Sequence, residues 1–333
     1  TKPGARTPIL CLLAMTAAVV APAADLPSPE EYRANWPRFR GPDGTGASAQ
    51  GDVPLSCDVK TGANIAWSVA VPAAGFNSPV VWDNRVFLSG GDEAKREVMC
   101  FDVQTGKLLW QRAVPKTAGS PDDPAEAPEQ SGMAAPTVAT DGRRVYAIFA
   151  NGDLAAFDFD GAVVWSKFLG VPKNSYGHAA SLITWQDRVI VQFDQGDADD
   201  KLSKLLAFDG ATGALVWEKP RAVGASWATP LVFDAAGASQ IVTLALPWVI
   251  SYSAKDGTEL WRADCLDGEV TPSPIFVGGT LFVISPGNKL QTIRPDGHGD
   301  VTKTHFGWVA EDGIPAVTSP TGNGELDRKS TRL

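Results

Sequence analysis

Short runs of Val, Leu, Ile and aromatic residues recur along this chain between turns rich in Gly, Asn and Asp. Such a pattern is typical of short β-strands joined by tight turns. The predicted first strands of five repeating units, most of them led by proline, are 78–82, 135–138, 180–183, 228–232 and 272–276. The second strands that follow are predicted at 85–88, 144–148, 188–191, 240–242 and 280–283. The pattern therefore predicts an all-β protein.

A repeated phrase marks the end of each unit. It runs over Cys100–Trp110, Ala207–Trp217 and Ser251–Trp261, and Ala156–Trp165 is the same phrase with one residue fewer in its turn. The third position is Asp or Ser, a Gly follows, and Trp closes the phrase. We interpret the phrase as a hairpin in which Asp accepts turn N–H groups, Gly supplies a positive φ and Trp packs against the neighbouring sheet. These residues are accordingly predicted to be structural.

The spacing of the tryptophans predicts the architecture. Successive copies lie 43–55 residues apart, at Trp67, Trp110, Trp165, Trp217, Trp261 and a more diverged Trp308. Four strands per unit at this period indicate a β-propeller of four-stranded antiparallel blades. Five blades are predicted to be complete, 64–67 is expected to be a lone outer strand, and 318–320 begins a further blade. Because a propeller must close its edges, seven or eight blades are expected in the whole propeller.

Composition and charge narrow the class. The 333 residues are 44% hydrophobic and carry a formal net charge of −9, which argues against nucleic acid and anionic membranes as partners. Residues 1–23 resemble a cleavable signal peptide, with Lys2 and Arg6 before an apolar run, so we expect a periplasmic or secreted protein. No transmembrane segment is predicted after residue 25. We divide the rest into an extended segment (24–62), the propeller (63–324) and a non-native or read-through tail (325–333).

The repeated phrase resembles the tryptophan-docking motif of PQQ-like, quinoprotein-type β-propeller repeats. The segment Asn35–Gly46 resembles the start of exported bacterial members of this family. The resemblance runs from about Trp36 to Gly324. It implies a non-catalytic binding or scaffolding module in the cell envelope, related in fold to the outer-membrane-assembly propeller lipoprotein, with an envelope protein as partner. A monomer is expected.

The same resemblance leaves two alternatives open. The first is a quinoprotein oxidoreductase that uses PQQ and calcium; such enzymes typically carry adjacent cysteines, a Glu/Asn calcium set and a catalytic Asp, and this sequence has no adjacent cysteines. The second is a carbohydrate-binding envelope protein. We expect no cofactor, no metal and no catalytic residue, and PQQ with calcium stays the cofactor of the first alternative.

The cysteine and acidic residues are candidates for disulfide bonds and for calcium binding. Cys100 occupies the small position of the phrase and is predicted to be buried, while a Cys57–Cys100 or Cys57–Cys265 disulfide is left open. An EF-hand starting at Asp194 would lack the required Gly and Glu, so we interpret 194–200 as a solvated loop.

The best candidate site lies in the linkers that precede the first strands, because these converge on the central channel at one face. They carry aromatic and polar residues at equivalent positions, suited to a small polar ligand, a glycan or a peptide. The candidates are Phe76, Asn77, Met133, Tyr176, His178, Trp227 and Glu269. The alternative interpretation is that these side chains only plug the channel and support the next blade.

Overall fold

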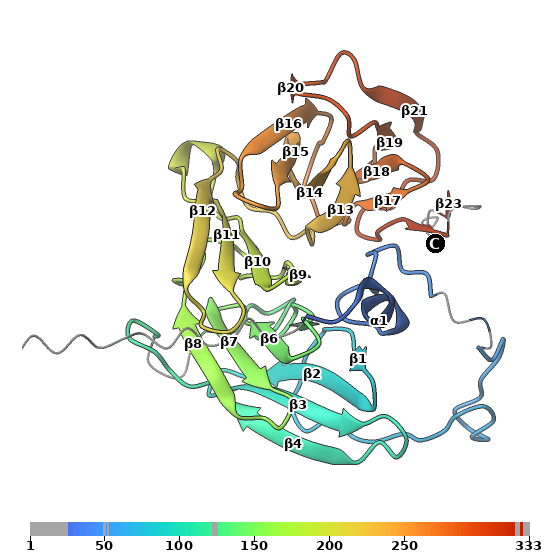
Figure 1. The fold of residues 1–333 in the computed structure, drawn as a ribbon, viewed down its shortest axis with the longest axis vertical. Helices are drawn as coiled ribbons and strands as arrows, with labels where there is room; N and C mark the ends of the chain where they lie inside the picture. The colour runs from blue at the N-terminus through green and yellow to red at the C-terminus, as the bar shows by residue number, and fades with distance from the viewer. Residues whose placement is uncertain (1–25, 49–50, 52, 122–125, 324–326, 329–333) are drawn as a thin grey trace, which may run out of the picture.

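The computed structural model describes residues 26–323, apart from 49–50, 52 and 122–125, together with 327–328. The predicted signal peptide lies outside the described residues, as does the predicted tail except for Asp327 and Arg328. These described residues form five sheets of at least four strands, which follow one another around a common centre (Figure 1). The predicted all-β class is confirmed.

The first three sheets are simple meanders. Sheet 1 contains β1 (Val80–Trp82), β2 (Arg85–Gly91), β3 (Arg96–Asp102) and β4 (Leu108–Ala113). Sheet 2 contains β5 (Ala139–Thr140), β6 (Arg144–Ile148), β7 (Asp153–Asp158) and β8 (Val163–Phe168). Sheet 3 contains β9 (Ile183–Trp185), β10 (Arg188–Phe193), β11 (Lys204–Asp209) and β12 (Leu215–Pro220), with the 3-10 turn η1 (Ala198–Asp200) between β10 and β11.

The last two sheets carry small variations. Sheet 4 contains β13 (Leu231–Ala235), β14 (Ala238–Ala245), β15 (Trp248–Ser253) and β16 (Glu259–Asp264), and β20 (Gly299–Asp300) adds a parallel strand to β16. Sheet 5 contains β17 (Ile275–Val277), β18 (Thr280–Ser285), β19 (Lys289–Ile293) and β21 (Phe306–Ala310). The short pair β22 (Thr321–Gly322) and β23 (Asp327–Arg328) follows.

The repeated phrase explains its own small first residue. In sheets 1 to 4 the Trp pairs directly across the ladder with that residue, as Trp110 does with Cys100, and the register then shifts by a bulge. A large side chain there would compete with the indole for space. Asp102 accepts from the backbone N–H of Thr105 at 2.8 Å, and Gly106 has φ +68°, as expected for the turn.

Trp110 and Trp165 each join one sheet to the next, and Trp67 joins the segment before sheet 1 to that sheet. The Nε1 groups of Trp67, Trp110 and Trp165 donate to the carbonyls of Val103, Phe159 and Gly210 at 2.7–2.9 Å. The indole also lies on the phrase glycine of the following sheet: a Cβ on Gly161 would stand 2.8 Å from the Trp110 ring. Trp308 differs, because its side chain on β21 is 53% exposed.

A row of hydroxyl groups links the sheets on the inside. In each link a backbone N–H just before a first strand donates to a Ser or Thr hydroxyl of the next unit, at 2.9–3.0 Å. We call this row the hydroxyl belt; its links are Ser78 to Thr137, Thr137 to Ser181, Ser181 to Thr229, Thr229 to Ser273, and Ser273 to Ser319. The belt connects all five sheets and the approach to β22.

The belt corrects the predicted first strands. They begin two to four residues later than the sequence indicates: β5 covers Ala139–Thr140 instead of 135–138, and β1 begins at Val80. Proline has no N–H to give to a ladder, and the N–H of the hydroxyl residue bonds to the next unit instead of the adjacent strand. The prediction of a strand at 64–67 is also wrong, since no described strand pairs with these residues.

The N-terminal segment, residues 26–48, crosses the far ends of the first strands. It begins with α1 (Pro29–Ala34), which Ser28 caps by accepting from Glu31 N at 3.1 Å. Its contacts are Trp36 with Val81 of β1, Pro37 with Thr140 of β5, Tyr32 with Thr184 of β9, and Arg40 with Thr321 of β22. Figure 1 shows α1 in the space that the sheets surround. The segment thus ties separate sheets together.

Candidate functional site

The linker before sheet 1 holds one exposed ring and one engaged amide. The Phe76 side chain is 74% exposed. The Asn77 side chain instead donates to the carbonyls of Ser89 and Ala134 at 2.7 and 2.9 Å and accepts from Ser89 N. Because its amide group is fully hydrogen-bonded to backbone groups of two units, Asn77 connects these units and has a structural role.

Two other candidates stand at opposite extremes of burial. Met133 is 1% exposed and packs in the apolar core between sheets 1 and 2. Glu269 is exposed, and its side chain lies on the linker to sheet 5. The structure therefore does not gather all the predicted residues around one surface.

Tyr176 and Trp227 do come together, from the linkers to sheets 3 and 4. Their rings meet edge to face with centroids 5.1 Å apart, and both side chains are half-buried. Asn174 holds the pair, since its Oδ1 accepts from Trp227 Nε1 at 2.8 Å and from Tyr176 N at 3.1 Å. We call Asn174, Tyr176 and Trp227 the aromatic pair site. Edge-to-face packing leaves part of each ring open to a partner.

His178 lies just beyond this site but is 3% exposed. Its ring stacks on Phe193 with centroids 5.3 Å apart, and its Nε2 has no hydrogen-bond partner among the residues that the structure describes. Burial lowers the pKa of His178 to about 4, against the opposing effect of a hydrogen bond with the Ala180 backbone. The imidazole is therefore neutral at physiological pH, and it supports sheet 3 from within.

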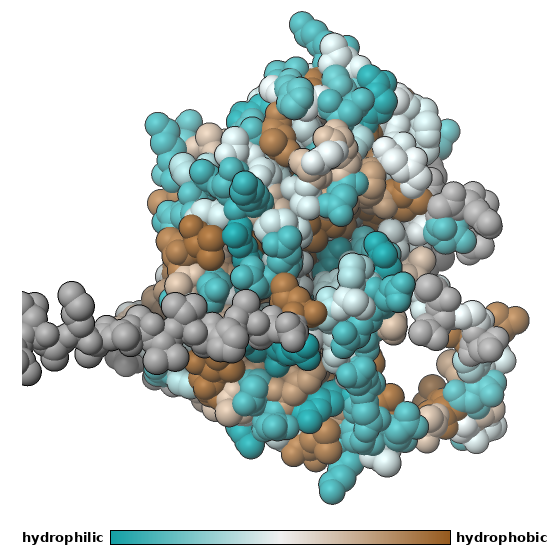
Figure 2. Space-filling view, in the orientation of Figure 1, coloured by the Kyte–Doolittle hydropathy of each residue, from teal (hydrophilic) through white to brown (hydrophobic). Residues whose placement is uncertain are grey.

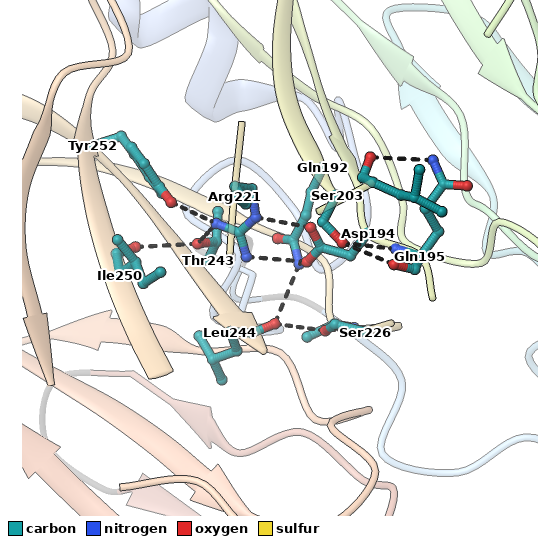
Figure 3. Close-up of polar contacts among 12 residues, drawn as sticks. Gln192, Asp194, Gln195, Ser203, Arg221, Ser226, Thr243, Leu244, Ile250 and Tyr252 are labelled. Carbon is teal, nitrogen blue, oxygen red and sulfur yellow. Dashed lines mark hydrogen bonds and ion pairs between the residues drawn. The ribbon is translucent and has the colours of Figure 1, made fainter. Parts of the chain in front are cut away.

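A buried polar network lies beneath the same linkers (Figure 3). Arg221 and Asp194, both fully buried, form a bidentate pair, with Nε–Oδ1 and Nη2–Oδ2 distances of 2.8 and 3.0 Å. Arg221 also reaches Thr243 and Tyr252 of sheet 4, while Gln192 Nε2 donates to Asp194 at 2.8 Å. Burial alone would lower the pKa of Arg221, but the Asp194 carboxylate raises it above its ordinary value. The guanidinium stays charged and joins sheet 3 to sheet 4.

This network corrects the prediction of a solvated loop at 194–200. Only the later residues are exposed, around η1, and Asp194 is the anchor of the network. Neither a Cys57–Cys100 nor a Cys57–Cys265 disulfide is present, because within the described ranges these three cysteines are free thiols. Cys100 is buried, as predicted. Burial raises the pKa of its thiol to about 12, so the thiol is not a nucleophile near neutral pH.

The described residues show no ready-made calcium site. Within the ranges that the structure describes, no group of three or more His, Cys, Asp and Glu side chains is placed to hold a metal ion. Both oxygens of the buried Asp194 carboxylate already bind Arg221, so they are not directed at a cation. We therefore derive no reaction step through PQQ with calcium.

A cavity of about 770 Å³ lies at the other end of the first strands, where no site was predicted. Its walls come mainly from α1 and the loop after it, and from residues of β9, β13 and β17. Figure 2 shows this orientation of the molecule, with hydrophilic residues covering much of the surface between separate hydrophobic patches. The only sequence signal for it was a set of aromatic residues at strand ends, which the strand pattern itself accounts for.

Comparison with known proteins places these features in a family. A family model described as outer membrane protein assembly factor BamB matches residues 37–198 and 201–300. A search of the curated proteins found no match.

Among solved structures, BamB from Moraxella catarrhalis is similar with a TM-score of 0.56 and 19% identity, over 80% of this chain and 72% of that one. A quinohemoprotein alcohol dehydrogenase from Pseudomonas putida gives 0.60 and 14%, over 86% of this chain and 49% of the enzyme. A quinohemoprotein alcohol dehydrogenase from Comamonas testosteroni gives 0.57 and 16%, over 87% and 52%. This chain thus spans about half the length of these dehydrogenases. At these identities the similarity shows the fold, a β-propeller of PQQ-like repeats. No helix in the described part of the chain has the length and apolar character that a membrane crossing requires.

Proposed function

Because this chain belongs to the family of the outer membrane protein assembly factor BamB, we propose that it is a non-catalytic binding module of the cell envelope. Its proposed partner is another envelope protein, in the periplasm or outside the cell. The proposal agrees with the signal-like N-terminal sequence and the acidic composition.

The observation that carries this proposal is the aromatic pair site. Tyr176 and Trp227 come from different linkers, are locked by Asn174, and remain half-exposed. Rigid, partly open aromatic side chains are the groups that most often anchor protein interfaces, because they bury much area at little entropic cost. Phe76, 74% exposed on another linker, would extend the same face.

The test is capture of a partner from envelope extract by the immobilised full chain. We expect a protein that the wild type retains and that Trp227→Ala and Tyr176→Ala release, while Trp308→Ala retains it. Trp308 is the matched control because it is an exposed indole on β21, away from the linkers. The proposal fails if both linker variants retain every protein that the wild type retains.

The quinoprotein oxidoreductase is the second candidate, favoured by the structural similarity to the two alcohol dehydrogenases. It is tested by mixing the chain with PQQ and calcium, then following absorbance and alcohol-dependent dye reduction. Calcium-dependent PQQ binding with dye reduction would overturn the non-catalytic assignment.

A further inference from the structure

We propose that the cavity beside α1 is a binding site for a short, uncharged oligosaccharide. This proposal does not rest on the aromatic pair site, because the cavity lies at the opposite ends of the first strands. One wall, including Tyr32 and Arg33, comes from residues that precede the part of the chain matched by the family model. Part of the cavity wall thus lies outside the ranges that the family model matches.

The α1 wall is held in place by contacts with three sheets. Tyr32 reaches Thr184 of sheet 3 at 3.1 Å, and its ring meets Trp82 of sheet 1 edge to face. The loop after α1 approaches sheet 4 so closely that a Cβ on Gly44 would stand 2.7 Å from Leu231, and Gly44 has φ +68°. A ligand entering the cavity thus meets a pre-formed wall, which lowers the entropic cost of binding.

The opposite wall offers aromatic surfaces at the ends of three sheets. Phe233 of β13 and Phe276 of β17 stack nearly parallel, with centroids 4.1 Å apart, and both are half-buried. Trp185 of β9 is also half-buried, and the Arg188 guanidinium lies 5.4 Å from its ring. A pyranose ring presents a face of C–H groups, which packs on such rings as other apolar surfaces do.

Polar side chains stand beside these rings and supply both donors and acceptors. Arg33 and Gln186 can donate, while Asp43, Asp234 and the Gln186 carbonyl can accept. Sugar hydroxyls need this mixture, since each donates and accepts. The positive charge in the cavity wall comes from the Arg33 guanidinium, which lies 4.0 Å from Asp43. The carboxylates of Asp43 and Asp234 outweigh it, so the net charge of the wall disfavours phosphate or carboxylate ligands.

The size of the cavity agrees with this ligand class. Binding sites for small molecules commonly enclose about 300–1,000 Å³, and a cavity of about 770 Å³ exceeds what a single sugar ring needs. We therefore assign the site to an oligosaccharide that lies along the rings of Phe233 and Phe276, with its hydroxyl edges toward Asp234 and Arg33.

The experiment is calorimetric titration of the full chain with chitotriose, cellotriose and maltotriose, each up to about 10 mM, well above a weak millimolar dissociation constant. We expect at least one probe to bind. Phe233→Ala should weaken that binding about tenfold, the equivalent of one lost aromatic contact. Asp234→Asn keeps the size of an exposed side chain but replaces a carboxylate oxygen with an NH2 group. It should weaken binding a few-fold, because one hydrogen bond to the sugar is lost or weakened.

Trp308→Ala, which alters an exposed ring outside the cavity, should leave the affinity unchanged. The proposal is overturned if no probe binds the wild type, or if the probe binds both cavity variants as tightly as the wild type. It is equally overturned if Trp308→Ala weakens binding as much as Phe233→Ala. Envelope-protein capture reads out the aromatic pair site separately, so either proposal can fail alone.

Discussion

At two junctions between neighbouring sheets, equivalent tryptophans of the repeated phrase make different contacts. Between sheets 2 and 3, Trp165 covers Gly213 and donates to Gly210 O at 2.9 Å. Between sheets 3 and 4, Trp217 covers Gly257 in the same manner, but its buried Nε1 has no hydrogen-bond partner in the described part of the chain. The repeat thus preserves the contact of ring on glycine without preserving the hydrogen bond.

Polar pairing at the second junction is provided elsewhere. The Arg221–Asp194 pair and its contacts with Thr243 and Tyr252 join sheets 3 and 4 through fully buried groups. The first junction is mainly apolar around Trp165 and Phe193. Comparing the two teaches that shape is repeated from unit to unit, whereas the place where polar groups find partners is decided by local residues.

The largest effect should come from Arg221→Met, which leaves the Asp194 carboxylate buried without its cation. We expect a loss of about 3–5 kcal/mol in the free energy of unfolding, measured by urea denaturation. The matched control is Arg262→Met: Arg262 makes the same two-bond contact with Glu259, but both side chains are about one-third exposed. That control should lose about 1 kcal/mol or less. Equal losses in the two variants would show that the second junction does not depend on its buried pair.

The first junction should instead be sensitive to acid, because His178 stacks on Phe193 there. The folded pKa is about 4, below the ordinary value of 6.5, so between these values the unfolded chain binds a proton that the folded chain refuses. Stability must then fall as pH drops through this window, by about 2 kcal/mol at pH 5. His178→Gln removes this titration. Urea midpoints for wild type and variant should therefore diverge between pH 7.5 and 5, and parallel profiles would contradict the assignment.

The smallest effect separates the two tryptophans directly. Trp165→Phe and Trp217→Phe both replace an indole with a phenyl ring, but only Trp165→Phe also removes a hydrogen bond. Trp217→Phe removes an N–H that has no hydrogen-bond partner among the described residues. We expect Trp165→Phe to cost about 1 kcal/mol more in the free energy of unfolding. If the two variants are equally stable, the hydrogen bond contributes nothing to the difference between the junctions.

Local patterns in the sequence were sufficient for the features that depend on neighbouring residues. The phrase predicted the burial of Cys100, the Asp102 turn and the positive φ of Gly106, because each arises within one hairpin. Second strands were predicted at nearly their observed positions for the same reason. The prediction of a strand at 64–67 was wrong because a strand needs a partner strand, which the pattern of one segment does not reveal.

The candidate site depended on long-range contacts and was predicted only in part. Tyr176 and Trp227 do meet, but nothing in the linker pattern indicated that Asn77 would bind backbone groups or that Met133 would be buried. Asp194 lies 27 residues from Arg221, and no spacing rule links them. The cavity was missed because α1 forms its wall from a segment that carries no repeat.

The hydroxyl belt has a consequence for the order in which the fold assembles. Each link joins positions 44–59 residues apart, so it closes a loop of about one repeating unit. The entropic cost of closing such a loop is nearly the same for every link, because it grows only slowly with length. A chain leaving the ribosome N-terminus first can close each link once the next unit has emerged. The belt therefore lets the sheets assemble in chain order by steps of similar entropic cost, and each new sheet is positioned by its bond to the sheet formed just before it.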